Sequence, residues 1–472
     1  MFSLIYYIIH WGKKRYNIER VNIMKNEVQT HMFSNRDLRK LLIPLALDQL
    51  LNSFMGTVDT LMVSNLGSSA ISAVSLVDSI NVLIVQAFFA LAAGGTVICS
   101  QYMGCGDRKN ATRSAKQLVF ITLFLSLIVS AVCLVGNEAI LRLIFGQVEE
   151  SVMVNARQYF YITAISFPFI ALYDDGASIF RSQENSRFPM TVSLLANVIN
   201  IGLNYFFVWV VHFGVAGAAI ATLISRAFSM ITVLVALRNP NWKISLTHYF
   251  RIRPDWAQIK KILYVGIPSG IENSMFQFGK LAIQSSVSLM GTAAIAAQGM
   301  TNIIESLNGI MAIGVGIGLM TIVGECIGAG RKDEAIYYMK KLCIIAEIVL
   351  LAGCLLFFVL VRPITYFGGM EPESAKICIF MVTCITIVKP IVWMFSFIPA
   401  YGFRAAGDVR FTMSVSVISM WLFRVTLATI LARIFHMGPI AVWIGMFTDW
   451  TIRGIIFSFR FHSRKWLNHQ II

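Results

Sequence analysis

Long apolar runs are the feature that most constrains the fold of this chain. Twelve stretches carry predominantly apolar residues over about 20 positions or more. A helix of about 20 residues crosses the roughly 30 Å hydrocarbon core of a bilayer, and it satisfies its own backbone hydrogen bonds there. The expected spans are 41–65, 72–103, 114–136, 156–180, 188–211, 214–237, 258–289, 294–327, 342–361, 376–402, 411–434 and 439–460. The pattern therefore predicts an all-α membrane protein with twelve transmembrane helices.

The composition excludes the other broad classes of protein. The chain is 57% hydrophobic and only 13% charged, with a mean hydropathy of +0.71. Soluble domains are about 45–50% apolar and about 25% charged, so these few charges could not cover so much apolar surface. The same composition excludes a disordered chain. The eight cysteines form no CxxC and no Cys/His cluster, so we expect buried thiols rather than disulfides or a zinc site.

The basic residues predict the orientation in the membrane. The net charge is +15, and most of the 39 lysines and arginines lie in alternate connecting segments. By the positive-inside rule those segments and both termini are cytoplasmic, which predicts a multi-pass protein of the cell membrane. The basic loops should also attract anionic membrane lipid. We expect no nucleic-acid partner, because no basic cluster is interleaved with aromatic residues on a polar domain.

The sequence repeats itself at a fixed spacing. Residues of the same type recur 224 positions apart, and the matched pairs are Pro44/Pro268, Gly67/Gly291, Gly94/Gly318, Gly104/Gly328 and Lys116/Lys340. Each half then has six helices, and because six is even, both halves enter the membrane in the same direction. The prediction is two pseudo-symmetric six-helix lobes in a parallel repeat, an arrangement that transporters use to rock one half against the other.

The repeat divides the chain into five expected segments. They are a cytoplasmic N-terminal extension (1–40), an N-lobe (41–237), a cytoplasmic linker (238–257), a C-lobe (258–460) and a cytoplasmic tail (461–472).

Three motifs resemble one transporter family. They are "VDTLMVSNLGSSAISAVS" after a Pro-containing helix start, "FGVAGAAIATLIS" at the start of the sixth span, and "GRKDEA" after the eighth. The chain is similar, from about residue 35 to 460, to the multidrug and toxic compound extrusion (MATE) family, within the multidrug/oligosaccharidyl-lipid/polysaccharide exporter superfamily. The resemblance implies a cation-coupled secondary antiporter that exports amphipathic drugs or metabolites by alternating access. It also implies a monomer with no cofactor beyond Na⁺ or H⁺ as coupling ion.

A group of polar residues is expected to meet near mid-depth in the N-lobe. Asn204 and Thr222 lie about nine residues on either side of the turn between the fifth and sixth spans, hence roughly 13 Å deep. Asp59 lies about eight residues before Gly67, in the turn after the first span, hence roughly 12 Å deep. Asn200 is one turn from Asn204 on the same face. The alternative interpretation is that the amides and the hydroxyl only join helices by hydrogen bonds.

The resemblance implies that Asp59, Asn200, Asn204 and Thr222 form the cation site. A buried carboxylate is costly in a membrane and is usually functional. Asn204 stands where many members of the family have Asp, so one carboxylate is missing. That argues against two protons or a divalent ion and leaves Na⁺ and a single H⁺ as alternatives. Pro44, about four turns before Asp59, permits a bend in the first helix. The resemblance implies that this helix bends with cation occupancy, and the alternative is a static kink.

The second half repeats the scaffold without repeating this site. Ile283 occupies the position that matches Asp59, and Met446 occupies the one that matches Thr222. The second half instead has charged residues inside its spans, which are candidates for lining a substrate cavity: Glu272, Lys280, Glu305, Lys389, Arg424 and Asp449.

Spacing predicts two pairs among these charges. Arg424 and Asp449 lie at similar distances from the outer turn between their spans, and so do Lys280 and Glu305. They are either structural ion pairs or the lining of a cavity for anionic or zwitterionic substrates.

Two other functions remain as alternatives. A flippase or exporter of a lipid-linked or anionic precursor would use Lys280, Lys389 and Arg424, although twelve spans favour the drug exporter. A membrane-embedded enzyme is not expected, because the sequence contains no HExxH and no GxSxG. It contains no GxxxxGK[ST] either, so ATP does not power the protein directly.

Overall fold

The computed structural model describes residues 31–64, 66–146, 148–247, 249, 253–287, 290–469 and 471–472. The described part is helical, and no strand is found in it. The helices are α2 (Asn35–Ser64), α3 (Ser68–Gly104), α4 (Arg108–Val135), α5 (Asn137–Phe145), α6 (Glu150–Ile165), α7 (Phe167–Arg181), α8 (Arg187–Asn204), η1 (Tyr205–Val210), α9 (Gly214–Ala236), α10 (Trp256–Val287), α11 (Thr292–Gly328), α12 (Lys332–Phe367), α13 (Pro372–Ala405), α14 (Val409–Ser419), η3 (Met420–Thr426), α15 (Leu427–Arg433), α16 (Ile440–His462) and η4 (Lys465–Asn468).

Every expected span is matched by a helix or by consecutive helices, so the prediction of the spans is confirmed. The fourth span consists of α6 and α7, which meet at Ser166, because Pro168 in the first turn of α7 cannot continue the hydrogen bonds of α6. The fifth and eleventh spans each contain a π-helical segment, η1 and η3. Nine stretches of the described chain are long and apolar enough to cross a membrane. The short helix α5 was not expected.

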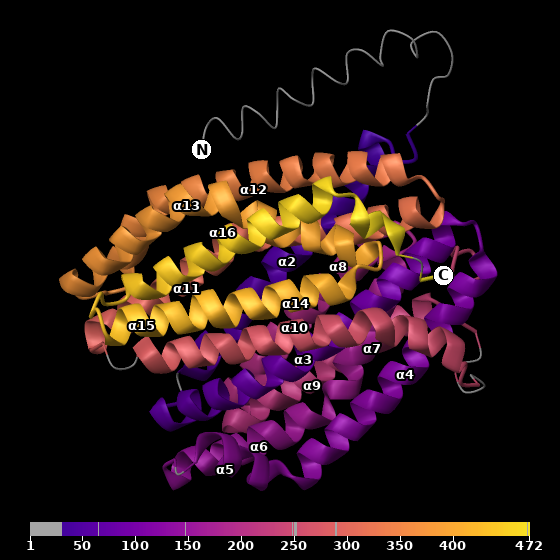
Figure 1. The fold of residues 1–472 in the computed structure, drawn as a ribbon. Helices are drawn as coiled ribbons and strands as arrows, with labels where there is room; N and C mark the ends of the chain where they lie inside the picture. Colours follow the sequence, from indigo (N-terminus) through magenta and orange to yellow (C-terminus); the bar gives the residue numbers. More distant parts are fainter. Residues whose placement is uncertain are drawn as a thin grey trace.

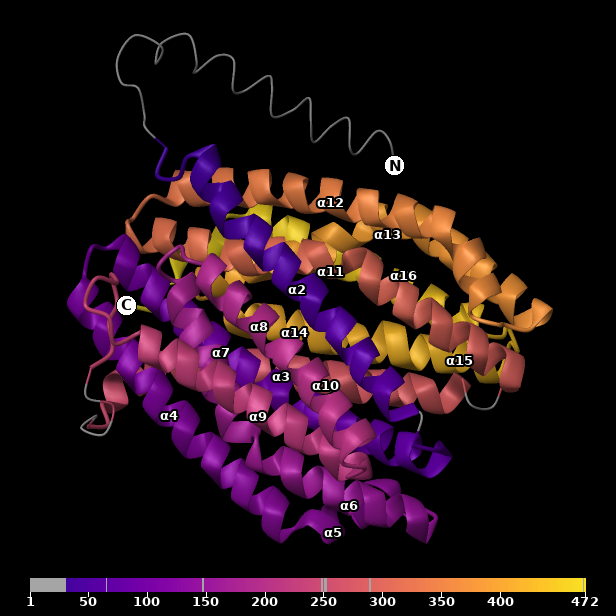
Figure 2. The same cartoon turned by 180° about the vertical axis from the view of Figure 1, so that it is seen from behind.

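The two halves pack through their first two helices (Figure 1, Figure 2). α2 packs against α8 of its own half and against α11 of the other half. Likewise, α10 packs against α14 of its own half and against α3 of the other half. Most of the other packing lies within one half: α3 packs on α4, α6 and α7, whereas α11 packs on α12 and α13. The structure therefore has two lobes of the expected kind, and each contributes its first helix to the boundary between them. The exact boundaries of the five expected segments stay a prediction, and most of 1–40 lies outside the described residues.

The repeat is visible in single contacts between α3 and α11. A Cβ atom on Gly104 would collide with the backbone oxygen of Glu325. A Cβ atom on Gly328 would collide with the backbone oxygen of Gln101. Gly328 and Glu325 follow Gly104 and Gln101 by the same 224 positions, so these are two copies of one contact. Only glycine allows the two backbones to approach so closely.

The described ends of the chain lie at the same end of the helix bundle (Figure 1). Tyr338 of α12 holds the residue before α2: its hydroxyl donates to the backbone oxygen of Phe33 and accepts from the backbone nitrogen, both at 2.8 Å. At the other terminus Asp408 pairs with Arg460 and His469. Asp107 caps α4 at this end by accepting from the backbone N–H of Asn110, which holds the pKa of Asp107 below its ordinary value. The side of the membrane that this end faces stays a prediction.

Candidate functional site

Three of the four predicted cation-site residues are joined by hydrogen bonds in the N-lobe. Asn204 Nδ2 donates to Asn200 Oδ1 at 3.0 Å, and Asn200 Nδ2 donates to Thr222 Oγ1 at 3.5 Å. Thr222 in turn donates to the backbone oxygen of Ala218, one turn earlier on α9, at 3.1 Å. Asn200 and Asn204 are both buried. The predicted convergence of the fifth and sixth spans is therefore correct for these three residues.

Asp59 belongs to α2, and its side chain lies outside the described residues. α2 packs along α8 and also contacts η1 and α9, so the helix that carries Asp59 runs beside the Asn204–Asn200–Thr222 chain. Pro44 is buried within α2.

The helix that carries the two asparagines changes geometry next to them. α8 ends at Asn204, and the following residues, Tyr205–Val210, form the π-helical segment η1. π-helical segments are rare and are frequent at functional sites. The fifth helix of the C-lobe has the equivalent feature in η3, which contains Arg424.

The N-lobe interior also holds acidic side chains that are not among the predicted site residues. Asp48 of α2 is buried, and Asp175 of α7 is fully buried beside Thr122. Asp174 lies within electrostatic range of both Asp48 and Arg181. The signal that could have identified the pair Asp174 and Asp175 is two adjacent aspartates inside an apolar run.

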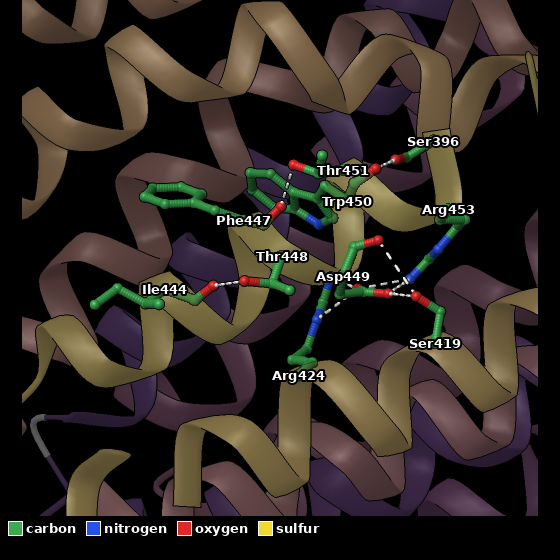
Figure 3. A network of polar contacts seen from close by, with 10 residues as sticks. All are labelled: Ser396, Ser419, Arg424, Ile444, Phe447, Thr448, Asp449, Trp450, Thr451 and Arg453. Atoms are coloured by element: carbon green, nitrogen blue, oxygen red, sulfur yellow. Dashed lines mark hydrogen bonds and ion pairs between the residues drawn. The ribbon is translucent and has the colours of Figure 1, made fainter. Parts of the chain in front are cut away.

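The C-lobe contains a buried cluster of two arginines around one carboxylate (Figure 3). Arg424 Nε donates to Asp449 Oδ2 at 2.9 Å, and its Nη2 lies 2.7 Å from the same oxygen. Arg453 Nη2 lies 2.7 Å from both oxygens of Asp449, and the Ser419 hydroxyl donates to Oδ1 at 2.6 Å. Arg424 and Arg453 are each 2% exposed, and Asp449 is not exposed at all. The predicted pairing of Arg424 with Asp449 is confirmed, whereas Arg453 was missed.

Lys389 forms a second buried ion pair. Its Nζ donates to Glu305 Oε1 at 2.6 Å and to the Glu305 backbone oxygen at 2.9 Å, and it also donates to Asn308 Oδ1. The Trp393 ring centroid lies 5.3 Å from the same nitrogen. Each proton of the ammonium group thus has an oxygen acceptor, which is the arrangement of a structural ion pair. The expected pairing of Glu305 with Lys280 is wrong, because Lys389 of α13 occupies the carboxylate.

Glu272 and Lys280, both on α10, differ in their partners. Glu272 pairs with Arg404 at 2.8 Å. Lys280 has no ion-pair partner within the described part of the chain, and it is exposed. Its ammonium lies within electrostatic range of Glu305 and Arg424 and 5.7 Å from the centre of the Phe276 ring. Five of the six candidates for the cavity are therefore paired, and Lys280 is the one left with an available charge.

The donors of the N-lobe group suit a small hard cation better than a transition metal. The described residues contain no group of three or more His, Cys, Asp or Glu that could hold a metal ion. Amide and hydroxyl oxygens are instead the ligands that hard cations accept.

Comparison with known proteins identifies the family. The MatE family model matches residues 44–206 and again 268–430, once in each lobe. A probable multidrug resistance protein NorM of Thermotoga maritima is 26% identical over 97% of this chain and 98% of its own length. An uncharacterized transporter YisQ of Bacillus subtilis is 26% identical over 90% of this chain and 93% of its own.

A solved structure has the same fold. It is a multidrug resistance MATE family transporter of the MOP superfamily in an outward-facing conformation, with a TM-score of 0.85 and 19% identity over 91% of this chain and 95% of its own. The relatives are transporters, which excludes the membrane-embedded enzyme. The two matches to the family model cover most of the chain, and we conclude that it belongs to the MATE family of compound-extruding membrane transporters.

Proposed function

We propose that the chain is a secondary antiporter in which entry of Na⁺ or H⁺ drives the export of amphipathic drugs or metabolites by alternating access. The observation that carries this proposal is the hydrogen-bonded chain from the buried Asn204 through the buried Asn200 to the half-buried Thr222. Together with Asp59, these residues make up the proposed cation site. Their oxygens are suitable ligands for a monovalent hard cation, and the carboxylate supplies the charge that balances it.

Asn200 is the hub of the proposed site. Its Oδ1 accepts from Asn204 and its Nδ2 donates to Thr222, so both neighbours depend on the orientation of its amide. The role of Asp59 is to hold Na⁺ or to take up a proton. With one carboxylate at the site, charge balance favours a single monovalent cation in each cycle.

Pro44 is the proposed bending point of α2. Proline has no backbone N–H, so one hydrogen bond of the helix is missing at that level. Because α2 contacts both α8 and α11, a bend in it would alter the contacts between the two halves. Binding of the cation beside α2 is thereby linked to the change of access.

The test is transport in proteoliposomes under an imposed Na⁺ or H⁺ gradient, with a panel of fluorescent amphipathic compounds. We expect one of the two gradients to drive uptake or efflux and Asp59→Asn to abolish the response. Asp37→Asn is the matched control, because Asp37 is a half-buried aspartate in the first turn of the same helix, where it bonds Ser34. Transport at a rate that neither gradient changes, or gradient-driven transport that persists in Asp59→Asn, contradicts the proposal.

We also propose that the protein acts as a monomer in the cell membrane, with anionic lipid at its basic loops and both termini cytoplasmic. Cys105, in the turn after α3, tests the orientation because it is exposed whereas the other cysteines are buried or half-buried. Partial burial and Asp107 raise the pKa of its thiol, so labelling calls for an alkaline buffer. A membrane-impermeant maleimide should label Cys105 in inside-out vesicles and not in intact cells. The opposite result would invert the topology.

A second candidate function is supported by the charges of the C-lobe. Two arginines share the carboxylate of Asp449, so this cluster has an excess of positive charge. An excess of that sign suits an exporter or flippase of an anionic or lipid-linked precursor. Gradient-independent movement of an anionic lipid analogue across proteoliposomes would favour this function over antiport.

A further inference from the structure

Three cationic side chains surround one aromatic ring in the C-lobe. The Phe276 ring centroid lies 4.8 Å from Arg424 Cζ, 5.8 Å from Arg453 Cζ and 5.7 Å from Lys280 Nζ. Both arginines form ion pairs with the same carboxylate, that of Asp449. The aromatic rings of Phe397 and Trp450 lie next to the same arginines.

The charges of this group do not balance. Arg424, Arg453 and Lys280 contribute three positive charges against the single negative charge of Asp449. Buried charges are stable only when they are paired, and an unpaired cation in a membrane protein usually faces a water-filled space or a ligand. In addition, Nε of the buried Arg453 has no hydrogen-bond partner among the described residues.

Lys280 is the accessible member of the group. Arg424 and Arg453 are each 2% exposed, whereas Lys280 is exposed. Its ammonium lies among charged side chains of the C-lobe, within electrostatic range of both Glu305 of α11 and Arg424 of η3. The ammonium is therefore directed toward the charged interior of the lobe, 5.7 Å from the centre of the Phe276 ring that the two arginines also contact. Lys389 offers the contrast within the same lobe, since it is 1% exposed and fully paired.

We propose that Lys280, backed by Arg424 and Arg453 and flanked by Phe276, binds the anionic group of an amphipathic aromatic substrate, namely a carboxylate or a sulfonate. Lys280 makes the direct contact, and the excess positive charge of the arginine cluster strengthens it. The ring of Phe276 offers a flat apolar surface for the aromatic part of the ligand. The inference rests on the proposed function in that the ligand is a transported substrate, but it does not depend on which cation drives transport.

Two dyes that differ only at the charged group provide the test. Rhodamine 110 has a free carboxylate, and rhodamine 123 is its methyl ester. Binding of each dye to the purified full-length protein in detergent is measured by fluorescence anisotropy. We expect rhodamine 110 to bind at least about tenfold more tightly than rhodamine 123, because its carboxylate can form a charge-assisted hydrogen bond with Lys280.

Three variants assign the preference to Lys280. Lys280→Gln should make the two affinities equal, while Lys280→Arg should keep the preference because it keeps the charge. Lys376→Gln is the control for the loss of an exposed lysine elsewhere in the lobe, and it should behave like the natural protein. Gel filtration checks that each variant is folded. Because Lys280→Arg changes the side chain but keeps its charge, a preference that survives in this variant is due to the charge and not to the packing of the lysine.

The outcomes separate this proposal from the antiport proposal. The binding assay involves no ion gradient, so a failure of gradient-driven transport leaves it intact. Equal affinities of the two dyes for the natural protein, absence of rhodamine 110 binding, or an unchanged preference in Lys280→Gln would each overturn the anion site.

Discussion

Asp449 and Arg453 lie one turn apart on α16, and Nη2 of Arg453 is 2.7 Å from both oxygens of the Asp449 carboxylate. Arg424 reaches the same carboxylate from η3, so polar side chains join the fifth and sixth helices of the C-lobe. In the N-lobe, Asn200 and Thr222 join the equivalent helices, α8 and α9, also beside a π-helical segment. The two lobes therefore use one architectural position in two ways: a neutral oxygen-rich group in the first and a positively charged group in the second.

Asp449→Asn should destabilise the protein strongly. The substitution would leave Arg424 and Arg453 buried without an anion, and breaking a buried ion pair from one side costs about 3–5 kcal/mol. Thermal unfolding in detergent measures the effect. Arg453→Met is the comparison, because it leaves a neutral Arg424–Asp449 pair, and we expect a much smaller loss of stability from it. If Asp449→Asn melts at the temperature of the natural protein, the carboxylate is not what holds the two arginines.

Lys389→Met should also destabilise the protein, by about 3–5 kcal/mol, because Glu305 would lose the cation that compensates its charge. The double variant Lys389→Met/Glu305→Gln removes both charges and should recover a large part of the loss. Thermal unfolding of the two single variants and the double variant forms a complete cycle. Additive effects of the two substitutions would show that the pair has no coupling and would contradict a structural role.

Gly328→Ala should disturb the contact between the lobes. The new Cβ would meet the backbone oxygen of Gln101, which cannot rotate away as a side chain could, so we expect a loss of about 1–3 kcal/mol or more. Gly299→Ala is the matched control on the same helix, because no atom of the described residues lies within 4 Å of its Cβ position. The control should be neutral or stabilising by about 0.5–1 kcal/mol, since alanine favours helix. Equal melting temperatures for the two variants would mean that the helices can separate without cost.

Asn200→Leu should reduce gradient-driven transport more than Thr222→Val does. Asn200 contacts two members of the proposed cation site, whereas the Thr222 hydroxyl also bonds its own helix at Ala218. We expect Asn200→Leu to lower the initial rate at least about tenfold, as loss of an orienting partner does at ion sites. Ser225→Ala is the control, because this buried hydroxyl of α9 bonds the backbone of Ala221 on its own helix. A rate in Asn200→Leu equal to that in Ser225→Ala would remove Asn200 from the site.

Much of the fold could be predicted because a membrane constrains the sequence strongly. Length and apolarity identify the spans, and the even number of helices in each repeat fixes how the halves are related. The depth of a residue in the membrane could be predicted too, because the helical rise per residue converts its sequence distance from a turn into a distance below the membrane surface. The pairing of Arg424 with Asp449 could be predicted in this way. Depth also predicted that Asn204 lies level with Thr222, whereas in the structure Thr222 bonds Asn200, one turn away from Asn204 on the same helix.

Depth does not determine the direction in which a side chain points. Lys280 and Glu305 have similar predicted depths, yet Glu305 pairs with Lys389 from a third helix. The face that each helix presents to its neighbours depends on packing, and spacing along one helix does not report it. The pairing of Arg453 with Asp449, in contrast, could have been predicted from the sequence. An arginine four residues after an aspartate lies on the same face of a helix.

The bonds between Tyr338 and Phe33 have a mechanical consequence. They fasten the beginning of α2 to α12 of the C-lobe, while the body of the same helix packs on α8 of the N-lobe. α2 is thus attached to both halves of the protein. A tilt of one half relative to the other would therefore strain this helix along its length. The strain would concentrate at Pro44, the level at which the helix lacks a backbone hydrogen bond.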